Sequence, residues 1–134
     1  MVSGRTWGGA ACWNYRRRRS LFGDRVWRTG YASYPYVRLR LDDAGCVILR
    51  SGRSQPEIMF AWPEVERMER VRVFGLPLLG EAVRITLKEE MYWGIPRRLL
   101  FFSRTRARTR EILGFAESRG VKVRRRARNM FVVP

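Results

Sequence analysis

The chain has 134 residues, 46% of them hydrophobic, which suits a single domain that buries a core without disulfide bonds or metal ions. Its net charge is +16, from 28 basic and 12 acidic side chains, and it contains no histidine. The missing histidine excludes every serine–histidine triad and removes the commonest general base and metal ligand.

Residues 1–33 are predicted to form an irregular basic arm. Five glycines interrupt the segment, and seven arginines against one acid, Asp24, give it a net charge of +6. Its most basic stretch is Arg16, Arg17, Arg18 and Arg19. Three tryptophans are unusual for a free tail, so we expect some of them to pack on the domain: Trp7, Trp13 and Trp27. The arginines follow the apolar residues, the reverse of a secretion signal, and a cytoplasmic location is expected.

Residues 34–123 are predicted to be the folded domain, which begins with strands. Val37, Leu39 and Leu41 alternate with arginines, the pattern of a half-buried strand. A turn follows at residues 42–45, where Gly45 is available for a positive φ. The same reasoning predicts strands over residues 37–41, 46–49, 57–62, 69–74, 83–87 and 99–102, with a loop over 75–80.

A change of hydrophobic period predicts one helix over residues 104–119. Ser103 is a suitable N-cap, and Gly120 is placed to end the helix before a short extended segment at 121–123. Strands followed by one helix indicate an α+β or mainly β fold, a bent antiparallel sheet or barrel capped by a C-terminal helix. The predicted core is Val37, Leu39, Leu41, Ile48, Phe60, Val71, Val83, Ile85, Phe101, Ile112 and Ala116.

Residues 124–134 are predicted to form a basic tail. Residues 34–95 are neutral overall, because eight arginines and Lys88 balance nine acids, whereas residues 96–134 carry a net charge of +10. Such a partition is typical of a folded domain with basic interaction segments at both ends. The two ends are therefore expected to supply most of the affinity for any polyanion. The open alternatives are solubilising tails and arginine usage set by a GC-rich coding sequence.

Alternate arginines occur at the start of the predicted helix, with Arg104 and Arg108 on one side and Arg106 and Arg110 on another. Positive charge there opposes the helix dipole, and a surface that retains such a cost is a candidate anion site, although plain solvation also explains it. The candidate anion-binding residues are Arg16, Arg17, Arg18, Arg19, Arg104, Arg108, Arg124, Arg125 and Arg126.

No motif for catalysis or cofactor binding is present. Gly75 and Gly80 have the first half of the phosphate-loop spacing, but no lysine follows them. The adjacent Asp42 and Asp43 are typical of a solvated turn, and the acids near Glu69 alternate with arginines as on an exposed, salt-bridged face. We therefore expect no catalytic residue, no cofactor and no enzyme activity.

The two cysteines, Cys12 and Cys46, cannot form a tetrahedral zinc site without histidine partners. No metal site is therefore expected. Two reduced thiols are the expected state in a cytosolic chain, and a single disulfide is the alternative.

Four short motifs follow one another in the predicted domain. They are Ser33-Tyr34-Pro35 before Val37-x-Leu39-x-Leu41, then Phe60-Ala61-Trp62-Pro63-Glu64-Val65, Gly80-Glu81-Ala82-Val83-Arg84, and Glu111-Ile112-Leu113 with Arg119-Gly120-Val121. In this order, over about 90 residues, they resemble the small pleckstrin-homology-like (PH-like) domains of actinobacterial proteins. The resemblance implies a bent seven-stranded barrel, capped by a C-terminal helix, that binds peptides, lipids or partner domains without catalysis. Lipid-binding members use basic residues around the first hairpin, which here offers Arg38, Arg40, Arg50 and Arg53 and no lysine.

The sequence thus predicts a basic, non-catalytic binding module, an adaptor for a protein partner or an anionic membrane surface. The alternative is a sequence-independent nucleic-acid-binding protein that acts through its arginine-rich arms. No transmembrane segment is expected, because no uncharged run approaches the ~20 residues that span a bilayer.

Overall fold

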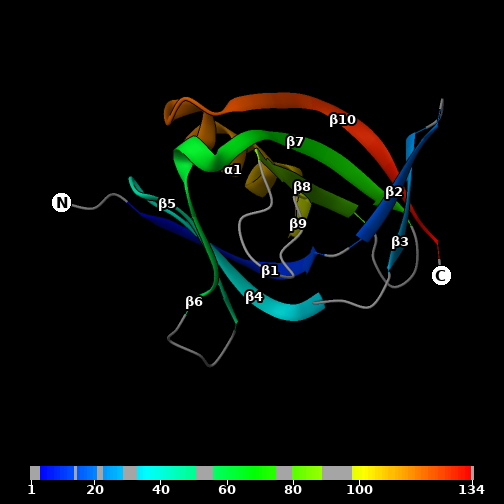
Figure 1. The fold of residues 1–134 in the computed structure, drawn as a ribbon, viewed down its shortest axis with the longest axis horizontal. Coiled ribbons are helices and arrows are strands. Elements are labelled where there is room, and N and C mark those ends of the chain that lie inside the picture. Colours follow the sequence, from blue (N-terminus) through cyan, green and yellow to red (C-terminus); the bar gives the residue numbers. More distant parts are fainter. Residues whose placement is uncertain are drawn as a thin grey trace.

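The structure is a computed structural model that describes residues 4–13, 15–20, 23–28, 33–50, 56–74, 80–88 and 98–133. Within these residues the chain is mainly β, with ten strands, a short 3-10 helix and one α-helix (Figure 1). The elements are β1 (Arg5–Trp13), β2 (Tyr15–Ser20), β3 (Gly23–Arg28), β4 (Ser33–Leu41), β5 (Gly45–Arg50), β6 (Pro56–Ala61), η1 (Trp62–Glu64), β7 (Val65–Phe74), β8 (Gly80–Leu87), β9 (Arg98–Arg104), α1 (Arg106–Ser118) and β10 (Lys122–Val133).

All of these strands belong to one mixed sheet in the order β2-β3-β10-β7-β8-β9-β1-β4-β5-β6. Neighbouring strands are antiparallel, except that β10 runs parallel to both β3 and β7. Figure 1 shows β7 and β10 side by side along the molecule, with β2 and β3 at one end. In the described residues the fold is therefore mainly β with one α-helix near the C-terminus, as the sequence predicts, but the sheet is mixed.

The sheet bends around a core that α1 helps to close. On β4, Val37, Leu39 and Leu41 are buried while the two arginines between them are exposed, which confirms the predicted alternation. All but one of the predicted core residues lie in this cluster. They are Val37, Leu39, Leu41, Ile48, Phe60, Val83, Ile85, Phe101, Ile112 and Ala116. We call the sheet face that borders this core the inner face.

The exception, Val71, belongs to a second apolar cluster. A register shift on β7 between Val65 and Arg67 leaves both Val65 and Met68 in the main core. Successive side chains of a strand point to opposite faces of the sheet. After Met68, the side chains of Glu69, Val71 and Val73 therefore lie on the opposite face, which we call the outer face. The prediction for Val71 is therefore wrong, although the residue is fully buried. The outer-face cluster consists of Val71, Val73, Ala82, Leu100, Phe102 and Met130.

Apart from Gly4, the described residues of the two predicted basic ends belong to strands of this sheet. β1 lies between β9 and β4, and its Trp7 is buried in the main core, so the prediction of an irregular arm over residues 1–33 is wrong there. The predicted tail, residues 124–134, continues as β10 to Val133 and lies between β3 and β7. Pairing with the neighbouring strands satisfies the backbone N–H and C=O groups of these segments. The arginine-rich sequence does not predict this pairing.

The helix begins later than predicted. Its N-cap is Thr105, whose side chain accepts a hydrogen bond from the Arg108 backbone N–H (3.2 Å), whereas Ser103 lies inside β9. The Ser103 hydroxyl is hydrogen bonded to the hydroxyl of Thr109 on the first turns of α1 (2.6 Å). The predicted end is confirmed, because Gly120 follows the helix with φ of 84°.

Gly45 serves a different purpose from the predicted one, since the glycines with positive φ among the described residues are Gly80 and Gly120. A Cβ atom on Gly45 would lie 2.1 Å from the carbonyl oxygen of Phe60, so glycine permits close pairing of β5 and β6. Most of the predicted loop over 75–80, residues 75–79, lies outside the described residues. No helix in the described part of the chain is long and apolar enough to cross a membrane.

Candidate anion-binding pocket

The outer face carries a group of charged residues beside its apolar cluster. On β7, Arg67 and Glu69 precede Val71 on this face, and on β8 Arg84 is paired directly with Glu69. The side chains of Glu69 and Arg84 are almost fully buried, with 4% and 2% of their surface exposed. An ionised pair at this depth needs both partners, because an unpaired buried charge is very costly.

β10 adds more basic residues through its parallel pairing with β7. Lys122 is opposite Arg67 and Arg124 is opposite Glu69, which puts both basic residues on the outer side. The register then shifts, and Arg128 is opposite Val71. The three residues of β10 between Arg124 and Arg128 therefore face the one residue of β7 between Glu69 and Val71. This irregularity brings Arg128 to the same cavity as Arg124.

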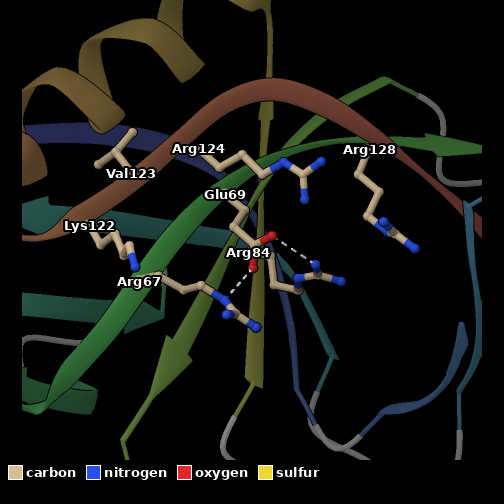
Figure 2. Close-up of a pocket in the computed structure, with 7 residues that line it drawn as sticks. All are labelled: Arg67, Glu69, Arg84, Lys122, Val123, Arg124 and Arg128. Atoms are coloured by element: carbon tan, nitrogen blue, oxygen red, sulfur yellow. Dashed lines mark hydrogen bonds and ion pairs between the residues drawn. The ribbon is translucent and has the colours of Figure 1, made fainter.

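These residues surround one open pocket of about 290 Å³. Figure 2 shows Glu69 at its centre, with dashed lines to the guanidinium groups of Arg67 and Arg84. The Arg67 Nε donates to Glu69 Oε1 (2.8 Å) and the Arg84 Nη2 donates to Glu69 Oε2 (3.1 Å). We call this cavity the outer-face pocket. It is lined by Arg67, Glu69, Arg84, Lys122, Val123, Arg124 and Arg128.

The outer-face pocket is strongly positive. Burial by itself disfavours ionisation of Glu69, but the charges and hydrogen bonds of Arg84 and Arg67 outweigh it and hold the pKa of Glu69 below its usual value. Glu69 is therefore a carboxylate at neutral pH, and it compensates one of the five basic side chains that line the cavity. This excess of basic over acidic side chains in the lining makes the pocket a candidate site for an anion.

A second, smaller basic pocket lies between α1 and the strands β7 and β10. It has a volume of about 210 Å³ and is lined by Arg70, Arg106, Thr109, Arg110, Leu113 and Arg125. Two of its arginines already have carboxylate partners: Arg70 donates to Glu81 (3.0 Å) and Arg125 to Glu117 (3.1 Å). This compensation makes it a weaker anion site than the outer-face pocket.

The structure separates the residues that the sequence proposed as one anion-binding set. Arg124 lines the outer-face pocket, Arg125 lines the smaller pocket, and Arg126 between them is exposed and lines neither. Arg108 donates to the Gly8 carbonyl (3.3 Å), and Arg104 ends β9 rather than lying on the helix, with φ of 74°. The backbone of Arg16, Arg17, Arg18 and Arg19 forms β2 at one edge of the sheet, and their side chains lie outside the described part of the structure.

Sequence reasoning missed most of the residues that line the outer-face pocket. Arg67 and Glu69 were predicted as part of an exposed salt-bridged face, whereas Glu69 is buried. The sequence gives Arg84 no role beyond its charge in the stretch of residues 34–95, which is neutral overall. One signal was available: Arg84 interrupts an otherwise uncharged strand, Ala82 to Leu87, whose residues are all buried.

The acids considered for catalysis have structural contacts. Asp42 accepts hydrogen bonds from the backbone N–H groups of Ala44 (2.9 Å) and Gly45 (3.0 Å) and so fixes the β4–β5 turn. Asp43 forms an ion pair with Arg119. Among the described residues, no group of three or more acidic or cysteine side chains could hold a metal ion. Cys46 is a buried free thiol, and the side chain of Cys12 lies outside the described part of the structure.

The fold and the site define a mainly β protein with a basic cavity on the outer face of its sheet. Comparisons of the chain with protein-family models, with curated proteins and with solved structures gave no match.

Proposed function

We propose that this chain is a non-catalytic binding module that docks an anionic partner at the outer-face pocket. The observation that carries the proposal is one cavity lined by five basic side chains and a single buried carboxylate, Glu69. Electrostatic attraction to such a surface speeds association and orients the partner. The absence of histidine from the chain supports a binding role rather than acid–base catalysis.

We also propose that strands β1 and β4 to β9, with α1, form a PH-like barrel. Their order in the sheet, β6-β5-β4-β1-β9-β8-β7, places two antiparallel meanders on either side of β1, and the helix follows the last meander. This order supports the seven-stranded, helix-capped barrel that the resemblance implies. In this interpretation β2 and β3 are an insertion, and β10 is an addition that completes the outer-face pocket.

A soluble partner, a protein in the first instance, suits this pocket better than a membrane surface. Stable attachment to a bilayer needs an apolar anchor in addition to charge. Among the described residues the large hydrophobic side chains that are exposed are Met59 and Phe74, and neither lines the pocket. We also propose that the protein is located in the cytoplasm.

Single-stranded nucleic acid is a second candidate partner, because of one aromatic contact. Phe74 at the end of β7 is 40% exposed and stacks on Phe131 of β10, with ring centroids 5.5 Å apart. The exposed Arg72 lies two residues before Phe74 on the same strand. Aromatic rings beside basic residues bind single strands by stacking and charge.

The test compares binding of four anionic probes across salt concentrations: an acidic phosphopeptide, single-stranded DNA, duplex DNA and anionic vesicles. We expect the phosphopeptide to bind and its affinity to fall with salt. Arg124→Gln should weaken binding, and Arg126→Gln is the matched control, since it removes the same charge from an exposed site outside the pocket. Failure of every probe to bind at low salt would overturn the proposal.

Preferential binding of single-stranded DNA, abolished by Phe74→Ala and unaffected by Arg124→Gln, would favour the second candidate. Tight binding to vesicles without binding to the phosphopeptide would instead identify a membrane as the partner.

A further inference from the structure

We propose that the outer-face pocket is a receptor for a phosphomonoester dianion carried by a soluble ligand. This inference rests on the proposed function and names the chemical group that the pocket takes. Three observations carry it: the donors that the lining offers, the positive charge that Lys122 and Arg124 add to the cavity, and the size of the cavity.

The donors come from side chains on two neighbouring strands. Arg67 uses its Nε–H for Glu69, and its side chain is 42% exposed, so its terminal amino groups reach the cavity. Lys122 and Arg124 line the same cavity from the exposed side of β10. Figure 2 shows these side chains around Glu69, two of them from β10 and one from β7. Donors that approach from several directions suit a tetrahedral group with three terminal oxygens.

Glu69 positions one of these donors, Arg67, and the buried Arg84 beside it. Its carboxylate is hydrogen bonded to Arg67 and to Arg84, so both guanidinium groups have a fixed orientation before a ligand arrives. Such preorganisation lowers the entropy that binding costs. Arg84 is 2% exposed and adds a charge that solvent screens poorly.

The charge of the pocket favours a monoester over a diester. The carboxylate of Glu69 is shared by Arg67 and Arg84. Lys122 and Arg124 add two further positive charges from the exposed side of β10. A phosphomonoester carries about −1.5 to −2 charges at pH 7, because its second pKa is about 6, and has three acceptor oxygens. A phosphodiester, as in a nucleic-acid backbone, has one charge and two terminal oxygens, so it offers less charge and fewer acceptors to Lys122 and Arg124.

The size of the pocket favours a small group. About 290 Å³ is at the lower end of the range for small-molecule sites, which is roughly 300–1,000 Å³. The cavity therefore accommodates a phosphate and the few atoms that carry it, such as a phosphorylated side chain or a small phosphorylated metabolite.

The experiment measures the affinity of the full chain for inorganic phosphate, O-phosphoserine, dimethyl phosphate and sulfate, by calorimetry at low salt. We expect phosphate and O-phosphoserine to bind more tightly than dimethyl phosphate. Their affinity should rise about tenfold from pH 5 to pH 7.5, because the dianion of O-phosphoserine forms near pH 6 and that of inorganic phosphate at a somewhat higher pH. Sulfate is a dianion throughout this range, so its affinity should not change, and it serves as the control for pH effects on the protein.

Variants on β10 locate the binding. Arg124→Gln should weaken O-phosphoserine binding about tenfold, as expected for a lost charge-assisted hydrogen bond. Arg124→Lys should be intermediate, since it keeps the charge and loses the planar donor pair. Arg126→Gln, with the same change of charge outside the pocket, should bind like the unmodified chain.

Three outcomes would overturn the inference: equal affinity for O-phosphoserine and dimethyl phosphate, phosphate affinity that does not change with pH, and equal losses in Arg124→Gln and Arg126→Gln. These outcomes are distinct from failure of the proposed function, which requires that long polyanions also fail to bind. Binding to phosphatidic acid vesicles without binding to O-phosphoserine would overturn the assignment to a soluble ligand.

Discussion

The indole nitrogen of Trp7 donates a 2.9 Å hydrogen bond to Oε2 of Glu111, which joins the first strand to the only α-helix in the described residues. The two residues are 104 positions apart in the sequence. The same carboxylate oxygen accepts from Arg5 (3.1 Å), whose guanidinium carbon lies 5.4 Å from the centre of the Trp7 ring. The N-terminal strand is thus attached to the helix by packing and by hydrogen bonding.

This relationship predicts a large loss of stability on truncation of Trp7. Trp7→Ala should lower the free energy of unfolding by about 3–5 kcal/mol, because the side chain is 95% buried in the main core. Glu111→Leu should cost about 1–3 kcal/mol, since it leaves a part-buried N–H without an acceptor, and Glu111→Gln, which keeps an oxygen, should cost less. Urea unfolding followed by circular dichroism measures all three. Unchanged stability of Trp7→Ala would mean that β1 is dispensable.

The strands could be predicted where hydrophobic and charged side chains alternate. They could not be predicted where the side chains are small or where several arginines follow one another. β4 alternates leucine with arginine, and its burial follows that pattern. The middle of β1 is Gly8, Gly9, Ala10 and Ala11, and the sheet is tight at Gly9, where a Cβ atom would lie 2.4 Å from the Phe102 carbonyl oxygen. That packing requirement removes the hydrophobic pattern that would identify a strand. β2 and β10 contain runs of arginine, a pattern that predicts a solvated arm or tail instead of a strand.

The site could be predicted only in part, because it depends on pairing between distant segments. Arg124 was identified from its basic cluster, but nothing local indicates that β10 pairs in parallel with β7 and places Arg124 beside Glu69. The buried pair of Glu69 and Arg84 depends in turn on the register of β7 and β8, which follows a local shift near Val65. A one-residue change of register would move these charges to the other face.

Gly45 should resist substitution even by alanine. An added Cβ atom would lie 2.1 Å from the Phe60 carbonyl oxygen and 2.9 Å from the Ala61 Cα, so the β5 and β6 backbones would have to separate. We expect Gly45→Ala to lower the free energy of unfolding by about 1–3 kcal/mol or more. Gly114→Ala in α1 is the matched control, because its Cβ meets nothing within 4 Å and should stabilise the helix by about 0.5–1 kcal/mol. Equal effects of the two changes on the urea midpoint would contradict the close approach.

Cys46 should be unreactive while the protein is folded. Its side chain is fully buried, and burial, with a smaller contribution from the charge of Asp42, raises the pKa of the thiol well above its usual value. In a Cys12→Ser background, a thiol-specific chromogenic reagent should therefore label Cys46 at pH 8 only as fast as the chain unfolds. Adding urea up to the transition should increase the labelling rate in parallel with the unfolded fraction. Rapid stoichiometric labelling without denaturant would show that this part of the core opens locally.

Glu69 and Arg84 should be energetically coupled. Arg84→Met alone should cost about 1–3 kcal/mol, because the buried carboxylate of Glu69 loses one of its two basic partners and keeps Arg67. The double variant Glu69→Leu with Arg84→Met removes both buried charges and should be considerably more stable than the single Arg84 variant. A double-mutant cycle measured by urea unfolding gives the coupling, and purely additive effects would mean that the ion pair contributes nothing to the native state.

Acid should destabilise this protein partly through Glu69. The pKa of Glu69 is lower in the folded state than its usual value of about 4.3, so the unfolded chain binds more protons in that range. The contribution of this carboxylate is therefore fully present above about pH 4.3 and is lost as the pH falls through the lower folded pKa. Glu69→Gln should be less stable than the unmodified chain at pH 6, and its stability should fall less steeply below pH 4.3. Glu117→Gln, at a carboxylate that is 58% exposed in a surface ion pair, should keep the original steepness. Urea unfolding at intervals from pH 3 to pH 6 makes the comparison, and parallel curves for Glu69→Gln and the unmodified chain would show that the two arginines do not stabilise the ionised carboxylate.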